Sequence, residues 1–213
     1  MPEYRLTCVN NSKLHGNFAL FQVPPQAPAP TRLTSVAWLA RPAAPGTQVR
    51  FSWSTEVGFI WGERGTFGGR STFTAYQYVP ADADRENLID FTADSFGAPA
   101  LQNLRTGGAQ GSLSIRQLSG TFDFPIHLGI AIGRSPIYTV DFTPNVLSIF
   151  TPHCHRCWVV FGNYAVGETI DVEALTNTQV VDFSTTSPAQ RVALTPENIL
   201  QQVAGQQGDP PFC

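Results

Sequence analysis

The alternation of short β-forming runs with turn-forming clusters constrains this chain most. The runs are rich in β-branched and aromatic residues, and clusters of Gly, Pro, Asn and Asp separate them, which is typical of strands. We expect strands at residues 4–9, 18–23, 35–40, 48–54, 59–63, 71–79, 87–92, 112–116, 127–132, 137–142, 146–151, 157–162, 168–172, 179–183 and 191–194. Because no helical segments alternate with these runs, parallel βαβ topology is excluded. The pattern predicts an all-β, antiparallel sandwich or jelly roll.

The size and local pattern of the chain predict one domain. In Val49-Arg50-Phe51-Ser52-Trp53 apolar and polar residues alternate, as in a sheet that packs on one face. A length of 213 residues without a linker-like change in composition favours a single domain over residues 1–213. Residues 24–30 and 97–111 are rich in Pro, Ala and Gly, so we expect long loops there that can close over a site.

Only the C-terminal region shows a convincing helix signal. It has a capping residue, a proline suited to the first turn, an apolar stripe and a terminating glycine. These are Thr195, Pro196, Ile199 with Leu200 and Val203, and Gly205. The pattern predicts a helix at about residues 196–204 and a frayed tail at 208–213.

Charge and hydropathy exclude several classes of partner. The net charge is -3, and the thirteen basic residues are scattered singly, so no basic stripe is available for nucleic acid. No stretch approaches the ~20 apolar residues of a membrane helix, and residues 1–11 show no secretory signal. We therefore expect a cytoplasmic protein without nucleic-acid or membrane partners; a homodimer stays open. Gly65, Gly68 and Gly69 fit a hairpin turn rather than a nucleotide-binding loop.

The segment from Pro152 to Trp158 crowds two imidazoles and two thiols together. His153, His155 and Cys157 are candidate ligands for zinc or copper, which accept nitrogen and sulfur donors. Alternate residues of a strand are ~6.6 Å apart, so Cys157 can join the histidines only if the segment turns. The alternatives are a Cys154–Cys157 disulfide or a loop without metal, in which case no cofactor is expected. A bridge between Cys8 and Cys213, near the two termini, also stays open.

An aromatic set predicts either a core or a ligand pocket. Its members are Trp53, Phe59, Trp61, Phe67, Phe73 and Tyr76, with Trp158 further along the chain, and Arg50, Glu56, Glu63 and Arg64 are interspersed among them. Sandwich cores contain such aromatics, but an apolar pocket with a few orienting polar groups needs the same residue types. Arg50, Glu63 and His127 are the candidate catalytic groups. The alternative for His127, which is alone on an apolar strand, is a buried structural histidine.

Several stretches together resemble the RhiA-like family of rhizosphere-expressed bacterial proteins. They are Tyr4-Arg5-Leu6-Thr7, Asn10-Asn11-Ser12, Ser35-Val36-Ala37-Trp38, Pro42-Ala43-Ala44-Pro45-Gly46-Thr47, Phe51-Ser52-Trp53, Trp61-Gly62-Glu63, Phe150-Thr151-Pro152-His153, Trp158-Val159-Val160-Phe161-Gly162-Asn163-Tyr164 and Gly167-Glu168. The resemblance implies one fold up to about Val172 and expression under cell-density control, but no assigned activity and no catalytic residues. The chain departs from the family after His153, which puts a family-wide metal role in doubt.

These observations lead to three functional hypotheses. The first is a pocket for a small apolar molecule, with a cofactor-free cyclisation, dehydration or cycloaddition, since such chemistry needs mainly a shaped, dry cavity. Fungal hetero-Diels-Alderases of tropolone sesquiterpene biosynthesis are similar in size and class only. The second is a non-catalytic protein that binds carbohydrate or a cell surface through exposed tryptophans. The third is a copper or zinc protein.

Overall fold

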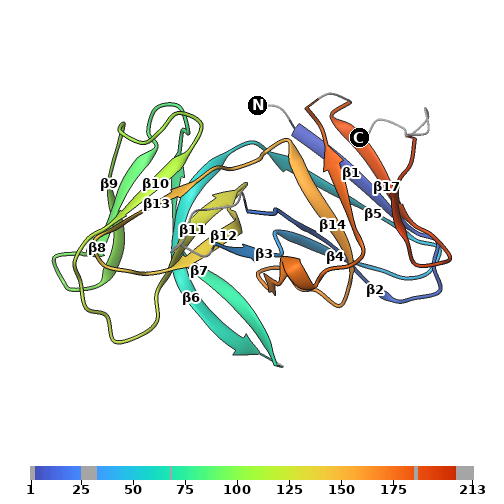
Figure 1. Ribbon diagram of the computed structural model, residues 1–213, viewed down its shortest axis with the longest axis horizontal. Coiled ribbons are helices and arrows are strands. Elements are labelled where there is room, and N and C mark those ends of the chain that lie inside the picture. Colours follow the sequence, from blue (N-terminus) through green and yellow to red (C-terminus); the bar gives the residue numbers. More distant parts are fainter. Residues whose placement is uncertain (1–2, 25–32, 68, 185–186, 205–213) are drawn as a thin grey trace.

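The computed structural model describes residues 3–24, 33–67, 69–184 and 187–204, which form four β-sheets (Figure 1). The β1 sheet has the order β18-β17-β1-β5, with β1 Glu3–Asn10, β5 Gln48–Ser54, β17 Ala189–Leu194 and β18 Leu200–Gln202. The β2 sheet has the order β16-β14-β2-β4, with β2 Gly16–Phe21, β4 Leu39–Ala43, β14 Arg156–Gly162 and β16 Thr178–Asp182.

In Figure 1 the β8 sheet forms the opposite end of the molecule, and the β6 sheet lies between the two ends. The β6 sheet has the order β15-β3-β12-β11-β6-β7, with β3 Thr34–Val36, β6 Val57–Phe67, β7 Arg70–Ala81, β11 His127–Ile132, β12 Ser135–Asp141 and β15 Thr169–Ile170. The β8 sheet has the order β13-β10-β8-β9, with β8 Leu88–Ala93, β9 Pro99–Arg105, β10 Leu113–Gln117 and β13 Val146–Phe150. A short 3₁₀ turn covers Val172–Ala174.

The all-β class is confirmed, and most strand pairs are antiparallel. Two pairs are parallel, β1 with β17 and β8 with β10, but no α-helix occurs among the described residues between the paired strands. The prediction of a loop over residues 97–111 is wrong in its middle, because β9 pairs there with β8. The other expected loop, 24–30, falls almost wholly outside the described residues. Among the described residues, no helix has the length and apolar character needed to cross a membrane.

The predicted C-terminal helix over 196–204 is wrong, because its residues form a hairpin between β17 and β18. Thr195 accepts a hydrogen bond from the Asn198 backbone amide, and Asn198 adopts a positive φ of 63°, which ends any helix there. The Thr195 hydroxyl accepts from the amide of Ile199, so it caps a turn instead of a helix. Leu200 is buried while Ile199 is exposed, which is the alternation of a strand. Gly205 and residues 208–213 lie outside the described part.

One cluster of buried apolar side chains includes members from all four sheets, for example Leu6, Phe18, Phe59 and Ile89. Trp38 is fully buried and packs edge-on against Trp53 with ring centroids 5.0 Å apart. Its indole N–H donates to the carbonyl of Ile132, which ties the segment before β4 to the β6 sheet. The core is therefore continuous from one end of the molecule to the other, and the single domain stays a prediction.

Candidate functional site

His127 is the first residue of β11 and lies between two other strands. It pairs with Gly62 of β6 on one side and with Asp141 of β12 on the other. The β11–β12 hairpin has a two-residue turn, in which Gly133 and Arg134 both have positive φ, as type I′ hairpin turns require. A register shift between Ile130 and Ala131 follows, and together with the turn it sets His127 across from Asp141. The side chain of His127 is only 9% exposed.

A polar cluster surrounds His127. Nε2 of His127 lies 3.3 Å from Oδ1 of Asp141, and Nη1 of Arg64 lies 3.7 Å from the same oxygen. Nη2 of Arg64 donates to the Thr139 hydroxyl at 3.1 Å. We call Arg64, His127, Thr139 and Asp141 the His127 cluster. The side chain of Asp141 is 77% exposed, so solvent screens its negative charge. Asp141 therefore attracts the positive groups of the cluster only weakly.

The environment of His127 favours the neutral imidazole. Burial lowers the pKa of His127, and the positive charge of Arg64 lowers it further, while Asp141 and Glu63 act in the opposite direction without prevailing. The ring is therefore neutral at pH 7, with one nitrogen as donor and the other as acceptor. A neutral imidazole is the form that can accept a proton.

Two nitrogen atoms in this cluster have no hydrogen-bond partner. Among the described residues, Nε of Arg64 and Nδ1 of His127 are the buried side-chain nitrogen or oxygen atoms left unpaired. A buried polar atom without a partner costs about 1–3 kcal/mol, so such atoms are rare in folded proteins. Both atoms belong to the His127 cluster, so this is the described part of the protein in which buried polar atoms are not paired with other protein groups.

A pocket of about 460 Å³ adjoins the cluster. His127 and Asp141 form its polar wall, and the loop before β11 supplies the apolar one. The remaining lining residues are Gly120, Thr121, Phe122, Phe124, Pro125, Ile126 and Phe142. Ring centroids of Phe122 and Phe142 are 5.4 Å apart, and both rings pack on Phe91. A mostly apolar wall with a few converging polar groups is the usual construction of a small-molecule site.

Two of the predicted aromatic residues, Trp61 and Phe59, pair with Leu128 and Ile130, so their side chains lie on the face of the β6 sheet opposite to His127. The ring centroid of Trp61 lies 6.1 Å from that of Phe91 and 5.4 Å from that of Tyr76. The aromatic cluster therefore continues from the pocket wall to the exposed Tyr76. Phe59 is buried in the same core cluster. Glu63 is close enough to influence His127.

The other predicted aromatic residues are spread over several sheets, and of these Phe73 lies directly across from Arg64. Trp53 is on the β1 sheet, where its indole N–H donates to the carbonyl of Cys154. Phe73 and Trp158 belong to two separate apolar clusters, and the side chain of Phe67 is outside the described part. Arg50 is also on the β1 sheet, across from Thr7. The predicted residues therefore do not line one common pocket.

The His153–Cys157 segment turns, as a metal site would need, but its side chains separate. The rings of His153 and His155 lie with centroids 6.5 Å apart, whereas Cys157 is fully buried in the main core. Burial raises the pKa of Cys157 strongly and that of Cys154 to about 11, so both stay protonated thiols. Within the described residues, no group of three or more His, Cys, Asp or Glu side chains is arranged to hold a metal ion.

The cysteines of this segment do not form the alternative disulfide. Cys154 and Cys157 are both free thiols, as is Cys8. Cys213, the other partner considered for Cys8, lies outside the described residues. Cys154 and His155 instead line a second, larger pocket of about 620 Å³ together with Glu56, Tyr78 and Arg134.

Comparison with known proteins places the chain in a family. A family model described as RhiA matches residues 1–204. The chain belongs to the RhiA family. Protein RhiA of Rhizobium leguminosarum bv. viciae is 25% identical over 184 residues, which cover 85% of this chain and 78% of that protein. No solved structure matches the chain. The RhiA resemblance noted in the sequence is thus confirmed, and it names no reaction.

Within this RhiA-family chain, the sequence identified His127 and Glu63 but not the partners that define the site. Arg64 was noted only as a polar neighbour of the aromatics, and Asp141 and Thr139 gave no signal. Register explains this, since β6, β11 and β12 must pair before Gly62, His127 and Asp141 become neighbours. Phe122 and Phe124 before the apolar strand at residues 127–132, and Phe142 at the end of the next strand, were the available hint.

Proposed function

We propose that this protein binds a small, largely apolar organic molecule in the pocket beside His127, and that the molecule carries an oxygen atom that accepts hydrogen bonds. The supporting observation is that His127, whose buried Nδ1 has no partner, lines an aromatic pocket, and that Arg64, whose buried Nε also has none, lies against Asp141 of the same pocket wall. The guanidinium Nε–H is always a donor, so an oxygen acceptor satisfies it. The Phe122 and Phe142 rings suit the apolar part of the molecule.

The charges of the site favour a neutral carbonyl group over a fully charged acid. Asp141 balances Arg64, and Glu63 adds a further negative charge near the neutral His127. An incoming carboxylate would meet this negative charge, whereas a carbonyl oxygen accepts hydrogen bonds without adding any. A ketone, enone or ester with an apolar body is therefore the ligand class that fits best.

We further propose that the cluster carries cofactor-free acid–base chemistry on this ligand. Neutral His127 accepts a proton from the substrate and later returns it, so the histidine is regenerated. Asp141 orients the Nε2 side of the ring, and Arg64 stabilises negative charge that develops on the carbonyl oxygen. A cyclisation or dehydration through an enolate uses these groups directly, and a cycloaddition uses the same polarisation of a carbonyl-activated double bond.

Surface binding through exposed tryptophans receives less support. Trp38, Trp53 and Trp61 are buried, and Trp158 is only partly exposed and packs near Phe21. The tryptophans therefore form no exposed row within the described residues, which a lectin-like surface would need.

A matched pair of probes tests the proposal. Acetophenone and ethylbenzene share an aromatic ring and differ in the carbonyl group. We expect acetophenone to shift the NMR signals of the His127 ring while ethylbenzene shifts them little, and Arg64→Gln to remove the difference. His15→Gln, in an exposed loop away from the cluster, is the control and should behave as the wild type. Equal shifts with both probes, or shifts that survive Arg64→Gln, would contradict the assignment of the carbonyl to this cluster.

A further inference from the structure

The edge strands of the four sheets differ in how they are protected against pairing with another chain. Exposed strand edges attract other strands, and natural proteins block them with charges, prolines, bulges or very short strands. Within the described residues, β15 and β18 are short at two and three residues. The edge strands β4, β5, β7, β9 and β16 each contain a charged residue or a proline, namely Arg41 with Pro42, Arg50, Arg70 with Pro80, Pro99 with Arg105, and Asp182.

The edge strand β13 has none of these protections. Its sequence is Val146-Leu147-Ser148-Ile149-Phe150, without charge, proline or glycine. Among the described strands it pairs only with β10, and all five of its residues are regularly paired there without a bulge. Leu147 and Ile149 are 52% and 53% exposed on its outer face, while Ser148 and Phe150 point into the protein. β13 is therefore a straight, apolar and unprotected edge.

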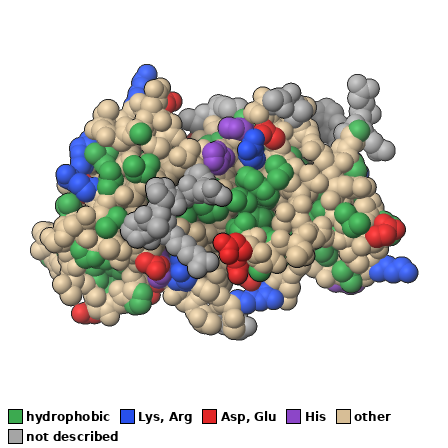
Figure 2. Space-filling model, viewed as in Figure 1, with side chains coloured by type: hydrophobic (Ala, Val, Ile, Leu, Met, Phe, Trp, Pro, Cys, Tyr) green, Lys and Arg blue, Asp and Glu red, His purple; other side chains and the backbone are tan. Residues whose placement is uncertain are grey.

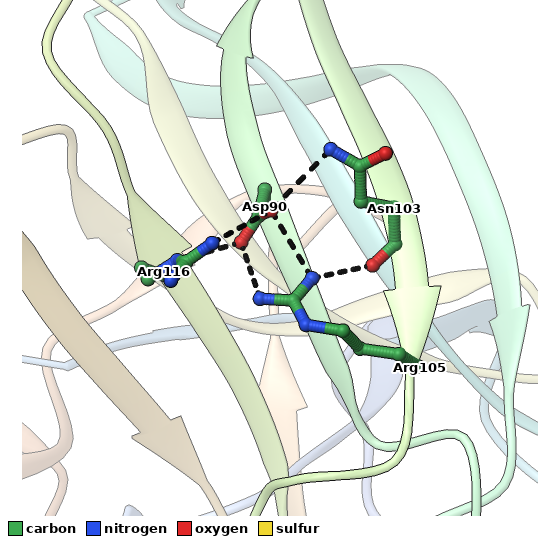
Figure 3. Close-up of polar contacts among 4 residues, drawn as sticks. All are labelled: Asp90, Asn103, Arg105 and Arg116. Atoms are coloured by element: carbon green, nitrogen blue, oxygen red, sulfur yellow. Dashed lines mark hydrogen bonds and ion pairs between the residues drawn. The ribbon is translucent and has the colours of Figure 1, made fainter.

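The strands beside β13 form a rigid platform. Asp90 on β8 accepts hydrogen bonds from Arg105, Arg116 and Asn103, which ties β8, β9 and β10 together (Figure 3). Arg116 lies directly across from Leu147, so this network and the two apolar residues share one face. Figure 2 shows basic side chains beside apolar ones at the end of the molecule that Figure 1 assigns to these strands. A preorganised edge loses little entropy when a further strand pairs with it.

We infer that β13 is the interface of a two-fold symmetric homodimer, in which β13 pairs antiparallel with β13 of a second copy. The sequence of the strand is self-complementary about Ser148. In that register Leu147 lies across from the partner's Ile149, and Ile149 lies across from the partner's Leu147. The two exposed apolar residues of each copy are then covered by those of the other copy, as a closed two-fold interface requires. The two β8 sheets become one continuous eight-stranded sheet, from four strands in each copy.

The strand β13 carries no charge, so two copies can pair along it without placing like charges directly opposite each other. The nearest charges belong to the network of Asp90, Arg105 and Arg116 on the neighbouring strands, where Asp90 neutralises part of the positive charge. Pairing along a five-residue strand buries less than the ~1,200–2,000 Å² of accessible surface that a standard interface buries, so we expect the dimer to dissociate reversibly. This inference does not depend on the His127 pocket.

Sedimentation velocity over a range of protein concentrations tests this inference on the full chain. We expect the wild type to change from monomer to dimer as concentration rises. Leu147→Lys and Ile149→Lys should each weaken dimerisation by ~100-fold or more, because a two-fold interface contains every substitution twice. Val180→Lys, at an exposed position of the edge strand β16, adds the same charge and is the matched control; it should dimerise as the wild type does.

Two results would overturn the inference. One is a wild type that stays monomeric up to a protein concentration of ~1 mM, the weak end of the usual range of dissociation constants. The other is a dimer that Leu147→Lys and Ile149→Lys leave intact while Val180→Lys disrupts it, which would move the interface to β16. Circular dichroism spectra that match the wild type will show that the variants are folded. We expect this result because both replaced side chains are already half exposed. Acetophenone binding at His127 should be the same in all variants, so failure here is distinguishable from failure of the pocket.

Discussion

Replacement of Asp90 by asparagine should destabilise the protein measurably, because Asp90 joins three strands of the β8 sheet (Figure 3). Its side chain is only 4% exposed, and its two oxygens accept four hydrogen bonds from Arg105 and Arg116 and one from Asn103. Asparagine keeps the shape but removes the charge, and it turns one acceptor into a donor that faces a guanidinium group.

The magnitude follows from the burial of the partners. Loss of one member of a fully buried ion pair costs about 3–5 kcal/mol, and an exposed pair contributes about 0–1 kcal/mol. Asp90 is buried, but the arginine side chains are 34% and 52% exposed, so solvent screens part of the interaction. We expect the free energy of unfolding to fall by about 2 kcal/mol, which lowers Tm by about 4–8 °C for a chain of this length.

The pH dependence gives this prediction a second, independent readout. Burial alone would raise the pKa of Asp90, but the hydrogen bonds from Arg116 and Arg105 outweigh it and hold the pKa below its ordinary value. The stabilisation is therefore complete above the unfolded-state pKa of about 3.9 and is lost as the pH falls through the lower folded-state pKa. The difference between wild type and Asp90→Asn should shrink accordingly in acid.

Urea unfolding at several pH values measures both effects. Glu3→Gln is the control, since the Arg5–Glu3 pair is exposed on both sides and its loss should change little. A loss below about 0.5 kcal/mol in Asp90→Asn would refute the reasoning, since surface substitutions stay within that range. A loss of the expected size that does not change with pH would show that packing, rather than charge, is responsible.

Three further predictions concern the core, the cluster and the thiols. Gly129→Ala should prevent stable folding or lower the free energy of unfolding by at least about 3 kcal/mol, since the new Cβ would lie 2.0 Å from the carbonyl oxygen of Tyr138. Gly65→Ala is the control, because its Cβ would meet nothing within 4 Å, and thermal unfolding should show it to be nearly neutral. The lowered pKa of His127 means that the unfolded chain binds the proton more readily, so the free energy of unfolding should fall as pH drops below about 6.5. Urea titrations between about pH 7 and 5 should show a weaker dependence of stability on pH in His127→Gln, and an unchanged dependence would contradict a buried neutral ring. Cys8 and Cys157, both buried with strongly raised pKa, should resist a thiol reagent at pH 8 until the protein unfolds, and rapid labelling of either in Cys→Ser variants of the others would contradict their burial.

Local sequence patterns predicted the strands well because alternation and turn residues act over short range. The hairpin between β6 and β7 is an example, with Gly69 at a positive φ in the expected turn. The C-terminal helix failed because Thr195 and Pro196 suit a helix start and a β-turn equally, and the pairing of β18 with β17 decides between them. Strand β9 was missed because tertiary pairing with β8 overrode a composition typical of loops.

The site was predictable only in part for the same reason. His127 was identifiable from the sequence, since an imidazole on an apolar strand is unusual. Arg64 and Asp141 come from strands 63 and 14 residues away and join it only through register across three strands. The aromatic set does not line one pocket because successive strand residues point to opposite faces. Phe73 packs with Ile60, whereas Trp61, the residue after Ile60, faces the main core.

The measurement that tests the central claim most directly is native mass spectrometry of the protein purified gently from its own host, beside Arg64→Gln prepared in the same way. We predict that the wild type carries the mass of a small organic molecule, and that this mass is lost or strongly reduced in Arg64→Gln. The same bound mass in both proteins, or the bare chain mass in both, would contradict a ligand site built on Arg64 and His127.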